Sequence, residues 1–229
     1  MLVLGHRGVI NETVSQNSLL TFQQAIETAD GFETDAVVSQ DGEIFLIHQE
    51  QENGTYSLAK HLDGASAERL GTRRLDQLSA AEIRTFRLRD GQPLPTLHEA
   101  IELAGLHAGK TLNIELKARD VVGPVLKLVK SSLQKGIIKP EALILSSFNH
   151  LALQAVRQEM PHLKTGAIFV TDDEAGEKLY PWIVEDKTAY AALTPAILQS
   201  PLLRVIQPDH RKGRGAARRS IQAMVLLAG

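Results

Sequence analysis

Three acidic residues in strand-like segments are the first candidates for chemistry. Glu33 and Asp35 stand two residues apart in the apolar run from Phe32 to Val38. Because successive side chains alternate across a strand, both carboxylates point to one face. Two buried carboxylates side by side are costly unless a cation neutralises them. The spacing therefore predicts a site for a hard divalent cation.

A third carboxylate lies in a separate strand-like segment. Glu115 belongs to the apolar run from Leu112 to Lys117, where alternation places Asn113, Glu115 and Lys117 on one face. Ligation by oxygen alone favours Mg²⁺, Ca²⁺ or Mn²⁺ over zinc, and the sequence has no cysteine to supply a zinc thiolate. The predicted cofactor is a divalent cation, Mg²⁺ or Ca²⁺.

Two histidines close predicted strands and add proton-transfer groups. His6 ends the first strand-like run and is followed by Arg7 and Gly8, and His48 ends the return strand of a predicted hairpin. Cleavage of a phosphodiester needs a base for the nucleophile, an acid for the leaving group and fixed positive charge, which Arg7 and Lys117 can provide. The combination favours a hydrolase for a small phosphodiester.

Each of these signals also has a plain structural interpretation. A single histidine at a strand end is usually a hydrogen-bonded structural residue, and an acidic pair two residues apart usually marks a solvated strand face. The structural interpretation weakens where the signals coincide, because inward charges in the apolar strand around Glu115 need a partner. The remaining histidines receive that interpretation: His61, His98, His107, His150, His162 and His210.

The elements that must position these residues alternate between short β-branched runs and longer runs of helical period, which predicts βα units and a parallel sheet. Strands are expected at Leu2 to His6, Phe32 to Val38, Leu112 to Lys117, Leu143 to Phe148, Gly166 to Val170 and Leu203 to Gln207, with Ile44 to His48 returning antiparallel after the turn at Asp41 and Gly42. Helices are expected at Ser18 to Ala29, Thr96 to Ala104, Val121 to Lys135, His150 to Glu159 and Ala216 to Leu227. The chain is interpreted as one domain, 1–229, with a polar, irregular insertion at about 49–92.

Composition excludes several classes of protein. The net charge of −2 gives no reason to expect a nucleic-acid partner, so the basic cluster from His210 to Arg219 is interpreted as a solvated surface. No apolar run approaches the roughly 20 residues that span a bilayer. The apolar start, Met1 to Gly5, is too short for a secretory leader, and with the lack of cysteine it predicts a cytoplasmic protein that acts on a small molecule.

The order of these motifs resembles the glycerophosphodiester phosphodiesterase family. The resemblance rests on Gly5-His6-Arg7-Gly8, Asn17-Ser18, Glu33-Thr34-Asp35, Asp41-Gly42, His48, Pro95-Thr96-Leu97, Ile114-Glu115-Leu116-Lys117 and Ser146-Ser147-Phe148. It implies a TIM (β/α) barrel that hydrolyses glycerophosphodiesters to glycerol 3-phosphate and an alcohol. It also implies a metal on Glu33, Asp35 and Glu115, acid–base roles for His6 and His48, and phosphate binding by Arg7 and Lys117.

Some positions depart from the family pattern. Gln16 stands where the family usually has Glu, and Gln49 where an Asp usually follows the second histidine. Only six strands can be named besides the hairpin return, whereas a closed barrel needs eight, so we expect a barrel incomplete at the C-terminus, in a chain truncated or frame-altered after about residue 210. Two alternatives remain open. One is a non-catalytic phosphate-ligand binder or inactive truncated barrel, and the other is a phosphodiesterase for a substrate such as a lysophospholipid.

Overall fold

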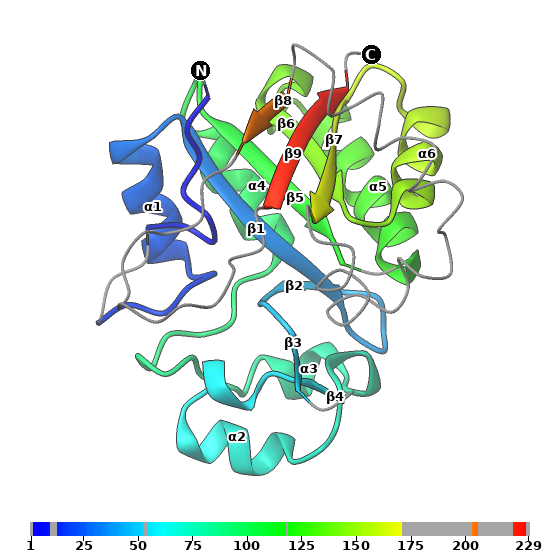
Figure 1. Cartoon of the computed structure of the whole chain (residues 1–229). Helices are drawn as coiled ribbons and strands as arrows, with labels where there is room; N and C mark the ends of the chain where they lie inside the picture. The colour runs from blue at the N-terminus through cyan, green and yellow to red at the C-terminus, as the bar shows by residue number, and fades with distance from the viewer. Residues whose placement is uncertain are drawn as a thin grey trace, which may run out of the picture. The chain divides into compact units, whose positions relative to one another are not determined.

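The computed structural model describes residues 2–9, 13–52, 55–117, 119–170, 203–205 and 222–227. Internal contacts divide the chain into two compact units, Met1–Ile144 and Leu145–Gly229. Every predicted site residue lies in the first unit, which is coloured from blue through cyan to green in Figure 1. Among the described residues, no helix has the length and apolarity needed to cross a bilayer.

The first unit is organised on the strand that carries Glu33 and Asp35, β1 (Gly31–Val38). It pairs antiparallel with β2 (Ile44–Leu46), and in parallel with β5 (Thr111–Leu116). The predicted hairpin is therefore confirmed, with Gly42 supplying the positive φ of 89° in its turn. The parallel β1–β5 pair brings the acidic segments of two distant parts of the chain side by side.

Three helices of the first unit follow the predicted positions: α1 (Leu19–Thr28), α4 (Leu97–Gly105) and α5 (Arg119–Gln134). Side-chain oxygens of Ser18 and Thr96 accept from backbone N–H groups in the first turns of α1 and α4, so both helices begin at capping boxes. The α1 helix packs on β1, where the rings of Phe22 and Phe32 stack with centroids 4.3 Å apart.

The prediction of a strand at Leu2 to His6 is wrong. This segment touches β1 through a single parallel bridge, Gly5 to Phe32, in which Gly5 N–H donates to the Gly31 carbonyl at 3.0 Å. The chain then turns away through Arg7 and Gly8, which have φ values of 58° and 84°. The pairing is too short for a strand, although it still sets His6 beside β1.

The insertion is more ordered than its polar composition indicates. It contains β3 (Glu50–Glu52), β4 (Thr55–Ser57), η1 (Ala59–His61), α2 (Gly64–Leu70), η2 (Leu75–Gln77) and α3 (Ala80–Ile83). Its apolar side chains are buried together with residues of the β1–β2 hairpin, so the expectation of an irregular segment is wrong. The buried cluster comprises Val37, Phe45, Ile47, Leu58, Leu62, Leu70, Leu75, Leu78, Ala80, Ile83, Phe86, Leu88 and Leu94.

The turn η3 (Pro140–Ala142) closes the first unit, and β6 (Leu143–Ser147) spans the boundary between the two units. The second unit then contains α6 (His150–Glu159), β7 (Lys164–Val170), β8 (Leu203–Val205) and β9 (Gln222–Leu227). Strand β9 pairs antiparallel with both β7 and β8. The predicted helix at Ala216 to Leu227 is therefore wrong over residues 222–227, because a short apolar run fits a buried strand as well as a helix. The predicted strand Leu203 to Gln207 is confirmed at 203–205. The basic cluster from His210 to Arg219 lies outside the described residues.

Candidate active site

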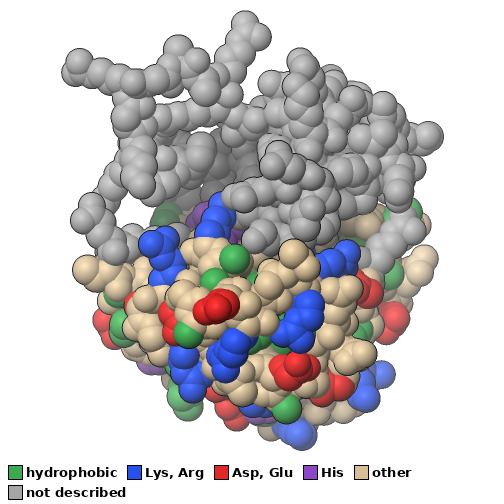
Figure 2. Space-filling model, turned by 90° about the horizontal axis from the view of Figure 1, so that it is seen from below, with side chains coloured by type: hydrophobic (Ala, Val, Ile, Leu, Met, Phe, Trp, Pro, Cys, Tyr) green, Lys and Arg blue, Asp and Glu red, His purple; other side chains and the backbone are tan. Residues whose placement is uncertain are grey.

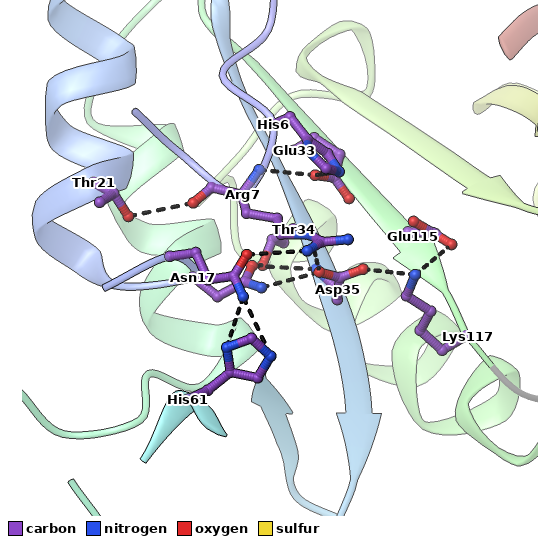
Figure 3. Close-up of polar contacts among 11 residues, drawn as sticks. His6, Arg7, Asn17, Thr21, Glu33, Thr34, Asp35, His61, Glu115 and Lys117 are labelled. Atoms are coloured by element: carbon purple, nitrogen blue, oxygen red, sulfur yellow. Dashed lines mark hydrogen bonds and ion pairs between the residues drawn. The ribbon is translucent and has the colours of Figure 1, made fainter. Parts of the chain in front are cut away.

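The structure brings the three predicted carboxylates together. One oxygen from each of Glu33, Asp35 and Glu115 lies within 4.8 Å of the others, and the residues are 7%, 0% and 6% exposed. The strand register explains the convergence, because Asp35 stands directly opposite Glu115 across the parallel β1–β5 pair. Figure 3 shows the three carboxylates on this shared face of the two strands.

Two cationic side chains lie against these carboxylates. The Lys117 ammonium is 2.8 Å from Asp35 Oδ1 and 2.8 Å from Glu115 Oε1. Arg7 Nε is 3.1 Å from Asp35 Oδ2, and the Arg7 backbone N–H donates to Glu33 Oε2 at 2.9 Å. Three carboxyl groups thus lie beside two cationic side chains in a buried setting, so a further cation would favour the ionised form of all three.

The acidity of the carboxyl groups follows from burial and from these neighbours. Burial raises the pKa of Glu33 well above its usual value, and the charge of Asp35 raises it further. Burial also raises the pKa of Glu115, against the opposing effect of Lys117. Asp35 behaves differently: burial alone would raise its pKa, but Lys117 and Arg7 hold it well below its usual value.

The donor set fits a hard divalent cation. All three residues offer carboxylate oxygens, the ligand type that Mg²⁺ and Ca²⁺ prefer. Glu33 Oε1 is buried and accepts no hydrogen bond from the described residues. A bound cation would satisfy this oxygen and would reverse the burial effect that raises the pKa of Glu33 and Glu115.

The two predicted histidines occupy different surroundings. The imidazole Nε2 of His6 lies 3.9 Å from Glu33 Oε2, and its side chain is 52% exposed. His48 is more buried, and burial lowers its pKa to about 2, assisted by the positive charges of Lys117 and Arg7 and opposed by Asp35. His6 is therefore accessible to solvent beside Glu33. His48 is neutral at ordinary pH and lies close enough to Asp35 for that carboxylate to affect its pKa.

Sequence reasoning missed a second layer of the site. Asn17, named in the sequence only as part of the Asn17-Ser18 motif, contacts the carboxylate site directly: its amide Nδ2 donates to Asp35 Oδ2 at 3.0 Å, and its Oδ1 accepts from Thr34 Oγ1 at 2.8 Å. Its φ of 53° lies in the left-handed region, which Asn tolerates better than most residues. His61, interpreted as structural, faces His48 edge-on with ring centroids 6.2 Å apart. The Asn-Ser pair beside the first helix was the one available signal, and nothing in the sequence pattern marked His61.

Comparison with known proteins agrees with this geometry. Residues 6–214 match the glycerophosphoryl diester phosphodiesterase family. A glycerophosphodiester phosphodiesterase of Caldanaerobacter subterraneus subsp. tengcongensis is 33% identical over 171 residues, covering 73% of this chain and 66% of that protein. Another from Bacillus altitudinis is 27% identical, covering 72% and 65%. This chain thus spans just under two thirds of the length of both curated relatives.

The fold comparison points the same way. A glycerophosphodiester phosphodiesterase structure from Parabacteroides distasonis superposes with a TM-score of 0.56 at 21% identity, covering 72% of this chain and 63% of that one. The expected α/β architecture is confirmed by the parallel pairing of β1 with β5, by the helices that alternate with the strands, and by this structural relative. The chain belongs to the glycerophosphoryl diester phosphodiesterase family and has its TIM (β/α) barrel fold.

Proposed function

We propose that this protein hydrolyses glycerophosphodiesters to glycerol 3-phosphate and an alcohol with the help of a divalent cation. The observation that carries the proposal is the convergence of Glu33, Asp35 and Glu115 beside Arg7 and Lys117. The names of the two curated relatives support the substrate class. The residue roles below are part of the same proposal.

The three carboxylates would hold the cation, with Mg²⁺ or Ca²⁺ as the candidates. Their all-oxygen character and the otherwise unsatisfied Glu33 Oε1 support this assignment. When bound, the cation supplies Lewis acidity that stabilises negative charge on the phosphoryl oxygens.

Arg7 and Lys117 would bind the non-bridging oxygens of the phosphodiester. A guanidinium presents several donors in a fixed plane, and Arg7 commits only some of them, with Nε against Asp35 and Nη1 donating to Gln16 Oε1 at 3.0 Å. The Lys117 ammonium, 2.8 Å from both Asp35 Oδ1 and Glu115 Oε1, supplies fixed positive charge beside the carboxylates that would attract an anionic ligand.

His6 and His48 would move the protons. One imidazole accepts a proton from the attacking water as its oxygen bonds to phosphorus, and the other gives a proton to the alkoxide oxygen as the phosphorus–oxygen bond breaks. The exposure of His6 lets it exchange protons with solvent, and the neutral state of His48 leaves a ring nitrogen able to accept. Water is consumed, and the protonated alcohol leaves.

Phosphorus NMR of the products tests the proposal. The purified protein is incubated with glycerophosphocholine and Mg²⁺ or Ca²⁺, and the phosphorus resonances are followed. The proposal expects glycerol 3-phosphate, whereas appearance of phosphocholine would mean that the other ester bond is cut. Saturable binding of the substrate without turnover would instead favour the non-catalytic phosphate binder. Lysophosphatidylcholine, run in parallel, tests the lysophospholipid alternative, and faster turnover of it would replace the proposed substrate class.

The proposed setting is the cytoplasm, with a small molecule as the partner. A chain without cysteine fits a reducing compartment. Among the described residues on the face seen in Figure 2, acidic and basic side chains are interspersed, which does not favour a nucleic-acid surface. Cell fractionation would check the location, and recovery with the membrane or periplasmic fraction would contradict it.

A further inference from the structure

One side chain of the insertion reaches the polar network of the candidate site. Gln16 Nε2 lies 2.7 Å from His61 Nδ1 and 3.3 Å from His61 Nε2. At its other end, Gln16 Oε1 accepts from Arg7 Nη1 at 3.0 Å. Figure 3 shows the His61 ring below the loop that carries Arg7 and Asn17. His61 is thus connected to the guanidinium through a single amide.

The donor rules determine how this connection is protonated. A guanidinium can only donate, so the Gln16 atom facing Arg7 must be the carbonyl oxygen. The Gln16 amide nitrogen then faces His61 and must donate to it. Its nearer partner, Nδ1, must therefore be the unprotonated nitrogen of a neutral imidazole whose proton is on Nε2.

The surroundings of His61 support the neutral form. The pKa of His61 is lowered to about 4, mainly by burial and also by the positive charges of Arg7, Lys60 and Arg89, while the charge of Asp35 opposes them. Among the described residues, the ring of His48 also faces His61 edge-on. The geometry and the electrostatics therefore agree on a hydrogen-bond acceptor at Nδ1.

The apolar core of the insertion holds His61 in place. His61 ends the short helix η1 between Leu58 and Leu62, which are 2% and 4% exposed. Its backbone N–H donates to the Leu58 carbonyl at 2.8 Å, and its carbonyl accepts from Arg89 N–H at 3.1 Å. Because the backbone of His61 is fixed by these contacts, its ring can hold the Gln16 side chain in one orientation. Folding of the insertion is therefore linked to the geometry of the site.

We propose that Gln16 and His61 form a positioning pair that fixes the direction of the Arg7 guanidinium, so that Arg7 is preorganised for the substrate phosphate. The proposal rests on the phosphate-binding role of Arg7 given above. It assigns no contact between His61 and the substrate. Arg7 is held from two sides, by Asp35 at Nε and by Gln16 at Nη1. Loss of the second support allows the guanidinium to rotate away from its binding geometry.

Kinetics of four variants test the pair. His61→Leu and Gln16→Leu should each raise KM for glycerophosphocholine roughly 5- to 20-fold while kcat changes less than about threefold, because a binding interaction is weakened. The double variant should be no worse than either single variant, since both remove the same support. His61→Asn should restore most of the loss, because its Oδ1 occupies nearly the position of Nδ1 and can accept from Gln16.

A matched control separates loss of this histidine from loss of any histidine. His98 is half exposed and pairs with Glu102 at 3.4 Å on α4, so His98→Leu should leave KM unchanged. Additive effects of the two single variants would overturn the pair. So would equal KM values for His61→Leu and His61→Asn, or a loss confined to kcat.

Nitrogen NMR of the imidazole tests the pair without any turnover. In the wild type at neutral pH, His61 should show an unprotonated Nδ1 and a protonated Nε2. Gln16→Glu should shift His61 to the doubly protonated form, because a carboxylate accepts from both Arg7 and His61. A proton on Nδ1 in the wild type would contradict the pair even if the enzyme is active. A protein that has the expected tautomer but no activity would contradict the proposed function while still supporting the pair of Gln16 and His61.

Discussion

Asp35 is the residue on which the polar contacts of the site converge. Its two oxygens contact Arg7 Nε at 3.1 Å, Asn17 Nδ2 at 3.0 Å and Lys117 Nζ at 2.8 Å. These donors stabilise the ionised form, so Asp35 keeps a low pKa although it is completely buried. Glu33 has fewer such donors and an elevated pKa. The two neighbouring carboxylates therefore differ in how much they would gain from a bound cation.

Replacing one carboxylate at a time should remove cation binding without unfolding the protein. Glu33→Gln, Asp35→Asn and Glu115→Gln each take away a charged oxygen ligand, and we expect each to weaken Mg²⁺ or Ca²⁺ affinity at least tenfold in calorimetric titration. Circular dichroism checks that the fold is retained. Wild-type affinity in Glu33→Gln would exclude Glu33 as a ligand, although its buried Oε1 accepts no hydrogen bond from the described residues.

The histidine variants test the proton-transfer roles. His6→Ala and His48→Ala should each lower kcat by roughly 10²- to 10⁴-fold, the usual contribution of a positioned acid or base, with cation affinity largely unchanged. Steady-state kinetics and the cation titration check the two halves of this statement. Near-normal turnover in either variant would remove that residue from the mechanism.

The lowered pKa of His61 also makes a stability prediction. Between pH about 4 and the unfolded value near 6.5, the unfolded chain carries the proton on His61 and the folded chain does not. The free energy of unfolding therefore rises with pH in this window and falls on acidification. Urea denaturation between pH 7 and pH 5 measures this effect. The free energy of unfolding of His61→Asn should fall less on acidification than that of the wild type, with a pH slope smaller by up to about one bound proton. An equal or steeper loss in the variant would contradict the buried, neutral state of His61.

At the scale of elements, most of the strands and helices that carry periodic patterns were predictable. Strand β1 and helix α1 have uninterrupted apolar faces, and Ser18 marks the start of the helix by its capping chemistry. Convergence of the carboxylates follows from side-chain alternation and parallel pairing. These are local rules, so the residues themselves reveal them.

Elements defined by distant contacts were not predictable in this way. The leucines of the insertion come from several short elements rather than from one long periodic run, so their common core became visible only in three dimensions. The contact of Gln16 with His61 joins residues 45 positions apart through that core. The segment Leu2 to His6 has the composition of a strand but makes only one bridge to β1. Composition does not determine how many residues of a segment pair with a neighbouring strand.

The buried cluster of the insertion should contribute to the free energy of unfolding as an ordinary hydrophobic core does. Leu88 is completely buried in the cluster, so Leu88→Ala should lower the free energy of unfolding by about 2–5 kcal/mol. Leu106, just after α4, is 81% exposed. Leu106→Ala should change the free energy of unfolding by less than about 0.5 kcal/mol. Denaturant titration compares the two variants. Similar costs for both would mean that the insertion adds no cohesive core.

In the molecule as a whole, the candidate site lies within one unit but consists of residues from widely separated parts of the sequence. Arg7 comes from the first turn, Asp35 from β1, His61 from the insertion and Lys117 from the end of β5. The first unit, Met1–Ile144, contains all of them. The proposed chemistry therefore depends on the integrity of this unit, including an insertion that contributes no proposed ligand.

Cation dependence of the proposed hydrolysis can be measured as the rate of glycerol 3-phosphate release from glycerophosphocholine. The rate is compared before chelation, after chelation and after return of a divalent cation. The wild type should hydrolyse the substrate, lose this activity when EDTA removes the cation, and recover it with Mg²⁺ or Ca²⁺. Asp35→Asn should remain inactive at every step. Hydrolysis that persists at full rate in excess chelator, or in Asp35→Asn, would contradict a cation-dependent site at these carboxylates.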